Sequence, residues 1–178
     1  MEFFISTLLF GISAGGQYAL IAIGYTMVYG ILRLINFAHG DVFMVAGLIG
    51  IYSTSWLTRL LSEIMAPEAA TAAAIPLSMV LVLVLTVVLG FFIERVAYKP
   101  LRSAPRMSVM ISAIGVSYLL QNTATYVTGG QPMTYPNIPM LSDTVPIAGT
   151  SIKWVVILTP FLVVALVIAL TQLINHTK

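Results

Sequence analysis

The chain has 178 residues, of which 59% are hydrophobic and only 8% are charged, and its formal net charge is +2. Soluble domains carry about 25% charged residues, so this composition excludes a soluble domain and predicts an all-α membrane protein. The small net charge does not indicate a nucleic-acid partner. The absence of cysteine excludes disulfides, thiolate metal sites and cysteine nucleophiles.

Five apolar stretches predict a polytopic bundle of about five transmembrane helices, which forms a single transmembrane domain over residues 1–178. The expected spans are residues 3–32, 36–57, 76–93, 107–127 and 154–174. Between them we expect three long connections, at residues 59–75, 94–106 and 129–153. The last of these is rich in proline and polar residues, which favours a fixed, extended loop.

The first span follows an N-terminus that has no Lys or Arg, so it does not resemble a secretory signal and is expected to remain as a helix. Residues 3–32 would extend about 45 Å as a helix, against a hydrocarbon core of about 30 Å. Gly11, Gly15 and Ala19 repeat every four residues, which predicts a face for close helix packing. Gln17 is a candidate for either a helix–helix hydrogen bond or the substrate pathway.

The start of the second span combines residues that are unusual inside a membrane helix. Asn36 is expected to cap the helix, while Gly40 and Asp41 are poor helix-interior residues. This pattern indicates either a helix that begins late or is broken beside a substrate pathway, or a turn at the membrane surface. His39 and Asp41 point to different sides of a helix, so they do not indicate a metal site.

The third and fourth spans differ in character. Residues 76–93 are almost purely aliphatic and are expected to face lipid, without functional residues. Residues 107–127 carry many hydrogen-bonding side chains, which are disfavoured against lipid, so this helix should be buried or should border an aqueous path. Its pathway candidates are Ser112, Gln121 and Asn122, and Ser117, Gln121 and Thr125 share one helical face.

Four of the eight Lys and Arg residues lie in the segment 94–106, and they are Arg95, Lys99, Arg102 and Arg106. Basic residues in short loops are retained on the cytoplasmic side, so this segment is expected to anchor the topology there. The same reasoning places the N-terminus and the loop 129–153 outside. After that loop, Trp154 begins the fifth span, and Pro160 is expected to kink it.

The chain resembles the LivH-type permease subunits of bacterial ABC importers for branched-chain amino acids. The resemblance is carried by GGQYALIAIGYTMVYGILRLINFAHGDVFMVAG (15–47), ERVAYKPLRSAPR (94–106) and ISAIGVSYLLQN (111–122). It covers most of residues 10–125 and is weaker beyond Gly129. Members of the family are considerably longer, so the resemblance implies that the chain is an N-terminal fragment that ends near the expected coupling loop.

The resemblance implies a transport subunit of the bacterial cytoplasmic (inner) membrane with no catalytic residue. Its expected partners are a second permease subunit, two cytoplasmic ATPase subunits, a periplasmic substrate-binding protein and the lipid bilayer. The chain lacks a GxxxxGK[ST] phosphate loop, so ATP would be used by the partners and no cofactor or metal is expected on this chain. The basic residues 95–106 would face the ATPase side.

Two alternatives remain open. A related permease could carry urea or short amides, because selectivity is expected to lie largely in the binding protein. An ion-coupled secondary transporter would need ionisable residues within its spans, whereas Asp41 and Glu94 lie near predicted span ends. An intramembrane enzyme is disfavoured, since Ser112 has no evident general base.

Overall fold

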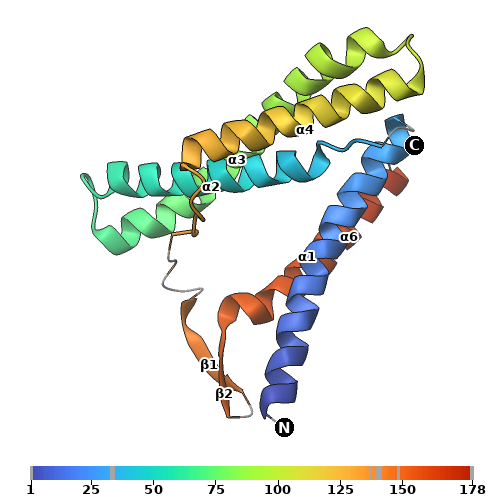
Figure 1. The fold of residues 1–178 in the computed structure, drawn as a ribbon. Helices are drawn as coiled ribbons and strands as arrows, with labels where there is room; N and C mark the ends of the chain where they lie inside the picture. The colour runs from blue at the N-terminus through green and yellow to red at the C-terminus, as the bar shows by residue number, and fades with distance from the viewer. Residues whose placement is uncertain (1, 33–34, 137, 139–141, 148, 177–178) are drawn as a thin grey trace. The chain divides into compact units, whose positions relative to one another are not determined.

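The computed structural model describes residues 2–32, 35–136, 138, 142–147 and 149–176, and helices dominate it (Figure 1). The chain forms two compact units: residues 1–30 with 137–178, and residues 31–136. Among the described residues, four helical stretches are long and apolar enough to cross a membrane, and they are Phe3–Gly30, His39–Leu61, Pro67–Leu101 and Trp154–Leu173. The predicted all-α membrane fold is therefore confirmed.

Three helices build the unit of residues 31–136. Helix α2 (His39–Leu61) and helix α3 (Pro67–Ile93) form a hairpin, and helix α4 (Arg106–Thr128) lies along α2. Figure 1 shows the three helices side by side. Helix α4 ends at Gly129, whose φ of 64° is left-handed, the conformation that glycine adopts readily at a helix C-terminus.

Small side chains bring α2 and α3 close together. The buried residues of α2 include Gly50, Ser53 and Thr54, and those of α3 are spaced by four: Ala70, Ala74 and Ser78. In lipid, where helices gain little from apolar burial, such close packing and interhelical hydrogen bonds hold helices together. The α2–α3 hairpin is therefore the best-packed part of the chain.

The expected loop at residues 59–75 is wrong, because most of it is helical. Helix α2 continues to Leu61, and α3 begins at Pro67, so the connection spans only residues 62–66. Proline suits the first position of a helix, the acidic Glu68 lies in the first turn, and the alanines that follow are the best helix formers. The alanine run therefore extends the third helix rather than a loop.

The basic segment 94–106 is also more ordered than the predicted loop. A π-helical turn (Glu94–Tyr98) and a 3-10 turn (Lys99–Leu101) continue α3, so that only residues 102–105 connect it to α4. Pro105 caps α4 in an extended conformation, with φ −54° and ψ 147°. Arg95 and Lys99 thus lie on a helical extension of α3 beyond its apolar part.

The other unit contains helix α1 (Glu2–Leu32), helix α6 (Trp154–His176) and a two-stranded hairpin. Helix α1 is unbroken, so a helix of about 46 Å must tilt or protrude from a core of about 30 Å. Strands β1 (Thr144–Ile147) and β2 (Thr150–Lys153) pair antiparallel, where a fixed, extended loop was expected. Pro160 lies inside α6.

Within its own unit, α1 packs through Gly16, which is adjacent to the predicted packing face of Gly11, Gly15 and Ala19. A Cβ atom on Gly11 or Gly15 would meet nothing within 4 Å, and Ala19 is exposed. A Cβ on Gly16, in contrast, would lie 3.3 Å from the Cγ2 atom of Val163 in α6. The face of Gly11, Gly15 and Ala19 stays a prediction for contacts with other helices.

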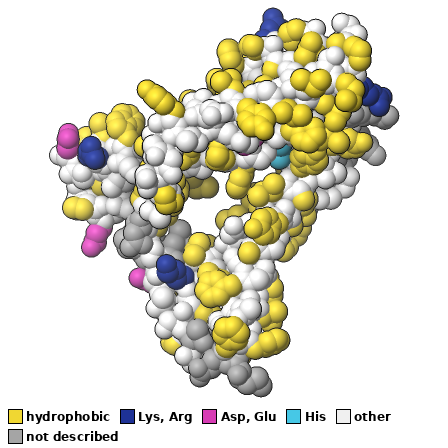
Figure 2. Space-filling view, viewed as in Figure 1, with side chains coloured by type: hydrophobic (Ala, Val, Ile, Leu, Met, Phe, Trp, Pro, Cys, Tyr) yellow, Lys and Arg dark blue, Asp and Glu magenta, His cyan; other side chains and the backbone are white. Residues whose placement is uncertain are grey.

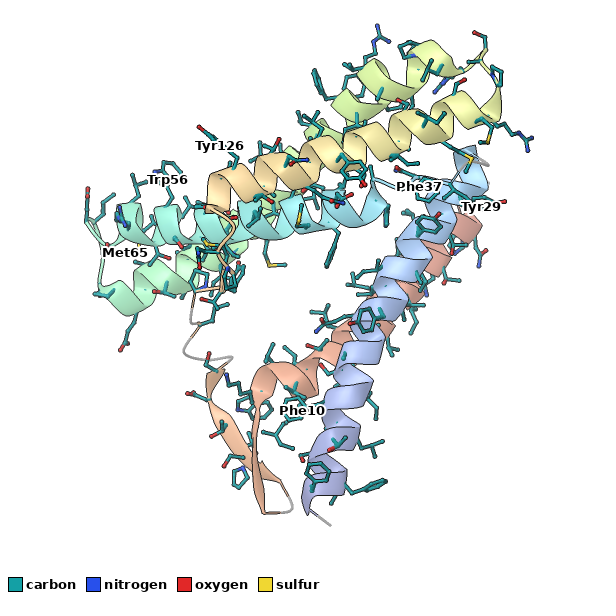
Figure 3. The ribbon with its side chains drawn as sticks, in the orientation of Figure 1. Phe10, Tyr29, Phe37, Trp56, Met65 and Tyr126 are labelled. Atoms are coloured by element: carbon teal, nitrogen blue, oxygen red, sulfur yellow. The ribbon has the colours of Figure 1, made fainter. Side chains whose placement is uncertain are left out.

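The outward surface of the helices is largely apolar. Figure 2 shows hydrophobic side chains over much of the visible face, with charged groups gathered mainly near the ends of helices. Trp56 and Tyr126 point away from the helices that carry them (Figure 3), and 59% and 89% of these residues are exposed. A surface of this kind suits contact with lipid or with other membrane helices.

Candidate substrate pathway

A carboxylate at the start of α2 is the centre of the candidate site. Helix α2 begins at His39, and Asp41 lies in its first turn, half-buried. The N-terminus of a helix carries a partial positive charge from unpaired N–H groups, which stabilises a carboxylate there. This position lets a charged group lie on a membrane helix at lower cost than in its middle.

Two side chains of α4 complete this site. The Ser117 hydroxyl donates a hydrogen bond to Asp41 Oδ2, and the Gln121 amide Nε2 donates to Asp41 Oδ1 at 3.0 Å. The same amide is 3.1 Å from Ser117 Oγ. We call Asp41, Ser117 and Gln121 the polar network; it joins two helices through one carboxylate.

Ser117 was missing from the candidates, although the sequence held a signal for it. It lies four residues before Gln121 and therefore on the same helical face. Serine alone is a weak indicator, because its hydroxyl often bonds its own helix. Only the fold brings it to Asp41, 76 residues earlier in the chain.

Asn36 plays a different role from the predicted helix cap. Helix α2 starts three residues later, after Ala38, and no side chain caps it. The Asn36 Oδ1 atom instead accepts hydrogen bonds from the Ala38 N–H at 3.1 Å and the Tyr98 hydroxyl at 2.7 Å. The correction has a simple cause: Asn side chains readily bond the backbone two residues on, which makes a turn before the helix.

Ser112 joins α4 to the same π-helical turn. Its hydroxyl donates to the Ala97 carbonyl at 3.0 Å, one residue before Tyr98. A π-helical turn leaves its carbonyls less regularly paired than an α-helix, and such turns occur often at functional sites. The turn therefore contacts both the start of α2, through Asn36, and α4, through Ser112.

The remaining candidates lie outside the polar network. The Asn122 amide donates to the Tyr118 carbonyl of its own helix at 2.7 Å and is exposed. His39 is half-buried at the first residue of α2. Gln17 is exposed on α1, in the other unit. Nothing in the structure tests their roles, which stay predictions.

The basic residues of the segment 94–106 are exposed between the end of the third helix and the start of α4. Arg95, Lys99, Arg102 and Arg106 are all exposed. Arg102 pairs with Glu94, with 2.6 Å between Nη2 and Oε1. Among the residues that the structure describes, this is the ion pair that forms, so three of the four cations have no acidic partner there.

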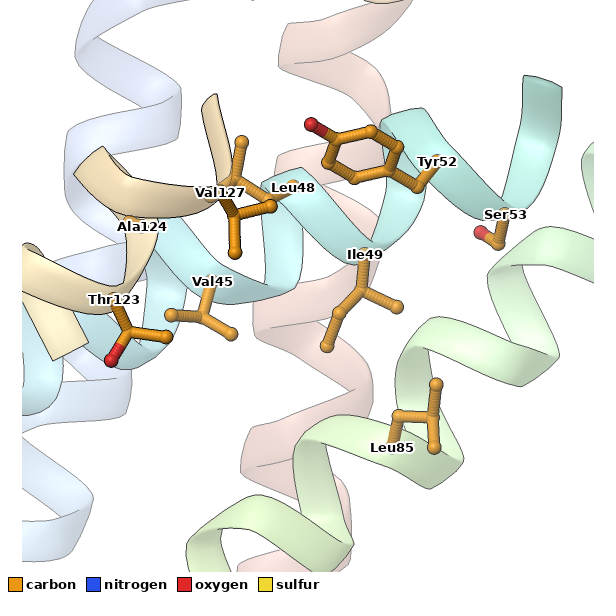
Figure 4. A pocket seen from close by; sticks show the side chains of 9 residues that line it. All are labelled: Val45, Leu48, Ile49, Tyr52, Ser53, Leu85, Thr123, Ala124 and Val127. Atoms are coloured by element: carbon orange, nitrogen blue, oxygen red, sulfur yellow. The ribbon is translucent and has the colours of Figure 1, made fainter. Parts of the chain in front are cut away.

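Among the described residues, largely apolar pockets border α2. One of about 350 Å³ lies between α2, α3 and α4 and is lined mainly by aliphatic side chains (Figure 4). A second, of about 510 Å³, lies between α2, α4 and residues 130–133, and a third, of about 500 Å³, between α2 and α3 beside Tyr135. Their linings would accept aliphatic groups rather than ions.

A second hydrogen-bond network, which joins the buried Thr54 and Ser78 to Tyr135, was not predicted from the sequence. The Thr54 hydroxyl donates to Ser78 Oγ at 2.8 Å and lies 2.8 Å from the Tyr135 hydroxyl. Tyr135 belongs to the segment after α4, and its ring also covers Gly50. Thr and Ser in apolar helices gave no signal of this contact, because both usually bond their own backbone.

Within the described ranges, no three metal-ligating side chains come together.

The chain matches the family model "Branched-chain amino acid transport system / permease component" over residues 7–178. The chain belongs to this family. No solved structure matches it.

Relatives in the family carry names that agree with this membership. The chain is 46% identical over 121 residues to the high-affinity branched-chain amino acid transport system permease protein BraD of Pseudomonas aeruginosa, which covers 67% of this chain and 37% of BraD. It is 37% identical to the permease protein LivH of Salmonella typhimurium and 36% identical to LivH of Escherichia coli K12, each over 76% of this chain and 42% of the relative. The chain thus spans about two fifths of the length of these relatives.

Proposed function

We propose that this chain is part of a permease subunit that carries branched-chain amino acids across the bacterial cytoplasmic membrane, in an ATP-driven importer. Family membership over residues 7–178 supports the transport role. The names of the relatives favour branched-chain amino acids over urea or short amides, and over an ion-coupled carrier.

The polar network supports this proposal at the level of individual residues. A branched-chain amino acid has an ammonium group, a carboxylate and an aliphatic side chain. The carboxylate of Asp41, held by Ser117 and Gln121, is a suitable acceptor for the ammonium group. The cavity of about 510 Å³ further along α2 and α4 suits the aliphatic group, because Met44, Leu48 and Ile51 line its α2 side, while Thr125, Thr128 and Gln131 add polar groups to its lining.

Energy for transport would come from partner proteins. We propose two cytoplasmic ATPase subunits, a second permease subunit and a periplasmic substrate-binding protein, because the chain has no phosphate loop of its own. This chain would then be a transport subunit and no enzyme. The segment 102–106, with Arg102 and Arg106 exposed, is our candidate for contact on the ATPase side.

The orientation is part of the proposal. The exposed cations of residues 95–106 support a cytoplasmic position for this segment, and a periplasmic N-terminus follows from the helix order. A reporter that is active only in the periplasm, fused after Ser103, should be inactive. Periplasmic activity of that fusion would reverse the orientation.

Uptake of labelled leucine by the assembled transporter tests the proposed function. We expect uptake that requires the ATPase subunits and ATP hydrolysis, with unlabelled isoleucine and valine competing and urea having no effect. Equal uptake without the ATPase subunits would contradict the importer class. Competition by urea or acetamide in place of isoleucine would keep the class and change the cargo.

A further inference from the structure

The third helix combines a long apolar face with an unpaired basic end. Its outward side is exposed along its length, with Val80, Val84, Val87 and Phe91 exposed by 63%, 48%, 64% and 67%. These residues are three or four apart, so they lie on one face. Arg95 and Lys99 continue the same spacing of four and are exposed as well.

The position of these two cations matches the level of lipid headgroups. Residues 75–93 contain no charged side chain, and as a helix they extend about 29 Å, close to the thickness of a hydrocarbon core of about 30 Å. The helical stretch continues without interruption to Leu101. When residues 75–93 fill the core, Arg95 and Lys99 lie just beyond it, and their long side chains can reach the phosphate layer.

The local charges leave these cations available. Glu94 is the acidic residue of the segment 94–106, and it is paired with Arg102 at 2.6 Å. Arg95 and Lys99 form no ion pair with any residue that the structure describes. Two exposed cations at the headgroup level, with no acidic partner, are complementary to an anion.

We propose that Arg95 and Lys99 bind the headgroup phosphate of an anionic membrane lipid, whose acyl chains lie along the exposed face of α3. The partner is a lipid rather than an acidic protein, because the site joins an anion-binding end to an apolar face that is about as long as an acyl chain. Arg95 lies in the π-helical turn, and Lys99 begins the 3-10 turn that directly follows it, so both cations stay on the helical continuation of α3. This inference concerns lipid and holds whichever substrate the protein carries.

Titration of the purified chain in detergent with phosphatidylglycerol, followed by native mass spectrometry, tests the proposal. Each cation near an anionic lipid contributes about a fivefold gain in affinity, so the double variant R95Q/K99Q should bind phosphatidylglycerol about 25-fold more weakly. Phosphatidylcholine with the same acyl chains should bind the wild type and this variant equally. Inorganic phosphate at equal concentration should not displace the lipid, because it lacks the acyl chains.

A matched control separates this site from a general effect of charge. The variant R59Q/K153Q loses the same two charges away from the end of the third helix, and it should keep the wild-type affinity for phosphatidylglycerol. An equal loss of affinity in both double variants would overturn the proposal, as would unchanged affinity in R95Q/K99Q. Circular dichroism of each variant confirms that the helices are intact, and neither result depends on transport.

Discussion

The hydroxyl chain between Tyr135, Thr54 and Ser78 has a direction that can be tested. Thr54 has one hydroxyl hydrogen and donates it to Ser78, while Ser78 donates to the Ile75 carbonyl at 2.8 Å. Tyr135 must therefore donate to Thr54. Thr54 and Ser78 are 1% and 0% exposed, so water does not replace a partner that either of them loses, whereas Tyr135 is 46% exposed and can reach water.

This direction predicts unequal costs for two conservative substitutions. Tyr135→Phe removes a donor but leaves Thr54 bonded to Ser78, so the free energy of unfolding should fall by about 0.5–1.5 kcal/mol. Thr54→Val removes two hydrogen bonds and leaves the buried Ser78 Oγ without the donor it accepts from, which should cost about 1–3 kcal/mol. In a chain that already carries Tyr135→Phe, the same Thr54→Val change should cost less, because only the hydrogen bond to Ser78 is then left to lose.

Equilibrium unfolding in mixed micelles, followed by circular dichroism, would measure the four proteins of this cycle. Double-mutant cycles give hydrogen bonds between membrane helices a coupling free energy of about 0.6 kcal/mol on average and up to about 1.7 kcal/mol. We expect a coupling free energy in the upper part of this range. Ser55→Ala is the control, because that exposed hydroxyl bonds only its own helix, and it should change stability by less than about 0.5 kcal/mol. The proposed direction of the hydroxyl chain would be refuted if the effects of the two substitutions added to within about 0.3 kcal/mol. It would also be refuted if Thr54→Val cost less than Tyr135→Phe.

Two further stability predictions follow from the same kind of geometry. Gly16→Leu should destabilise the chain by about 1–3 kcal/mol, because its Cβ atom would already press on Val163. Gly15→Ala meets open space and should be neutral or should stabilise the chain by up to about 1 kcal/mol. Thermal unfolding of both variants measures these effects, and equal effects of the two substitutions would contradict the prediction. Glu94→Gln should cost less than about 1 kcal/mol, because the Arg102 side chain is 66% exposed; a larger loss in the same assay would mean that the pair is more than a surface contact.

Apolar runs predicted the helices well, but the ends of the helices depended on weaker signals. The run of alanines after Pro67 looked like a connection because it is neither strongly apolar nor periodic, yet alanine has the highest helix propensity. The start of α2 was placed at Asn36 because asparagine is a good helix cap, while the Tyr98 hydroxyl and a local turn both use that side chain. Local preference was overridden by a contact 62 residues away.

In the candidate site, too, some residues were predictable from local sequence patterns, whereas their contacts depend on the long-range packing of helices. Asp41 and Gln121 were predictable as unusual polar residues in apolar helices, because such residues are expensive in lipid. Their contact with each other and with Ser117 was not predictable, since it depends on how α4 packs on α2. Tyr135 lies in a polar loop with no periodicity, so its contact with Thr54 and Gly50 of α2 left no pattern in the sequence.

Uptake of labelled leucine by transporters that carry substitutions in the polar network tests the central claim most directly. Asp41→Asn keeps the shape but removes the charge for the ammonium group, and Gln121→Leu removes one of its donors; we expect Asp41→Asn to lower uptake at least tenfold and Gln121→Leu to lower it less. Expression and ATPase co-purification should stay unchanged, and Ser55→Ala should transport like the wild type. Wild-type uptake by Asp41→Asn at normal expression would contradict a role for this network in the substrate pathway.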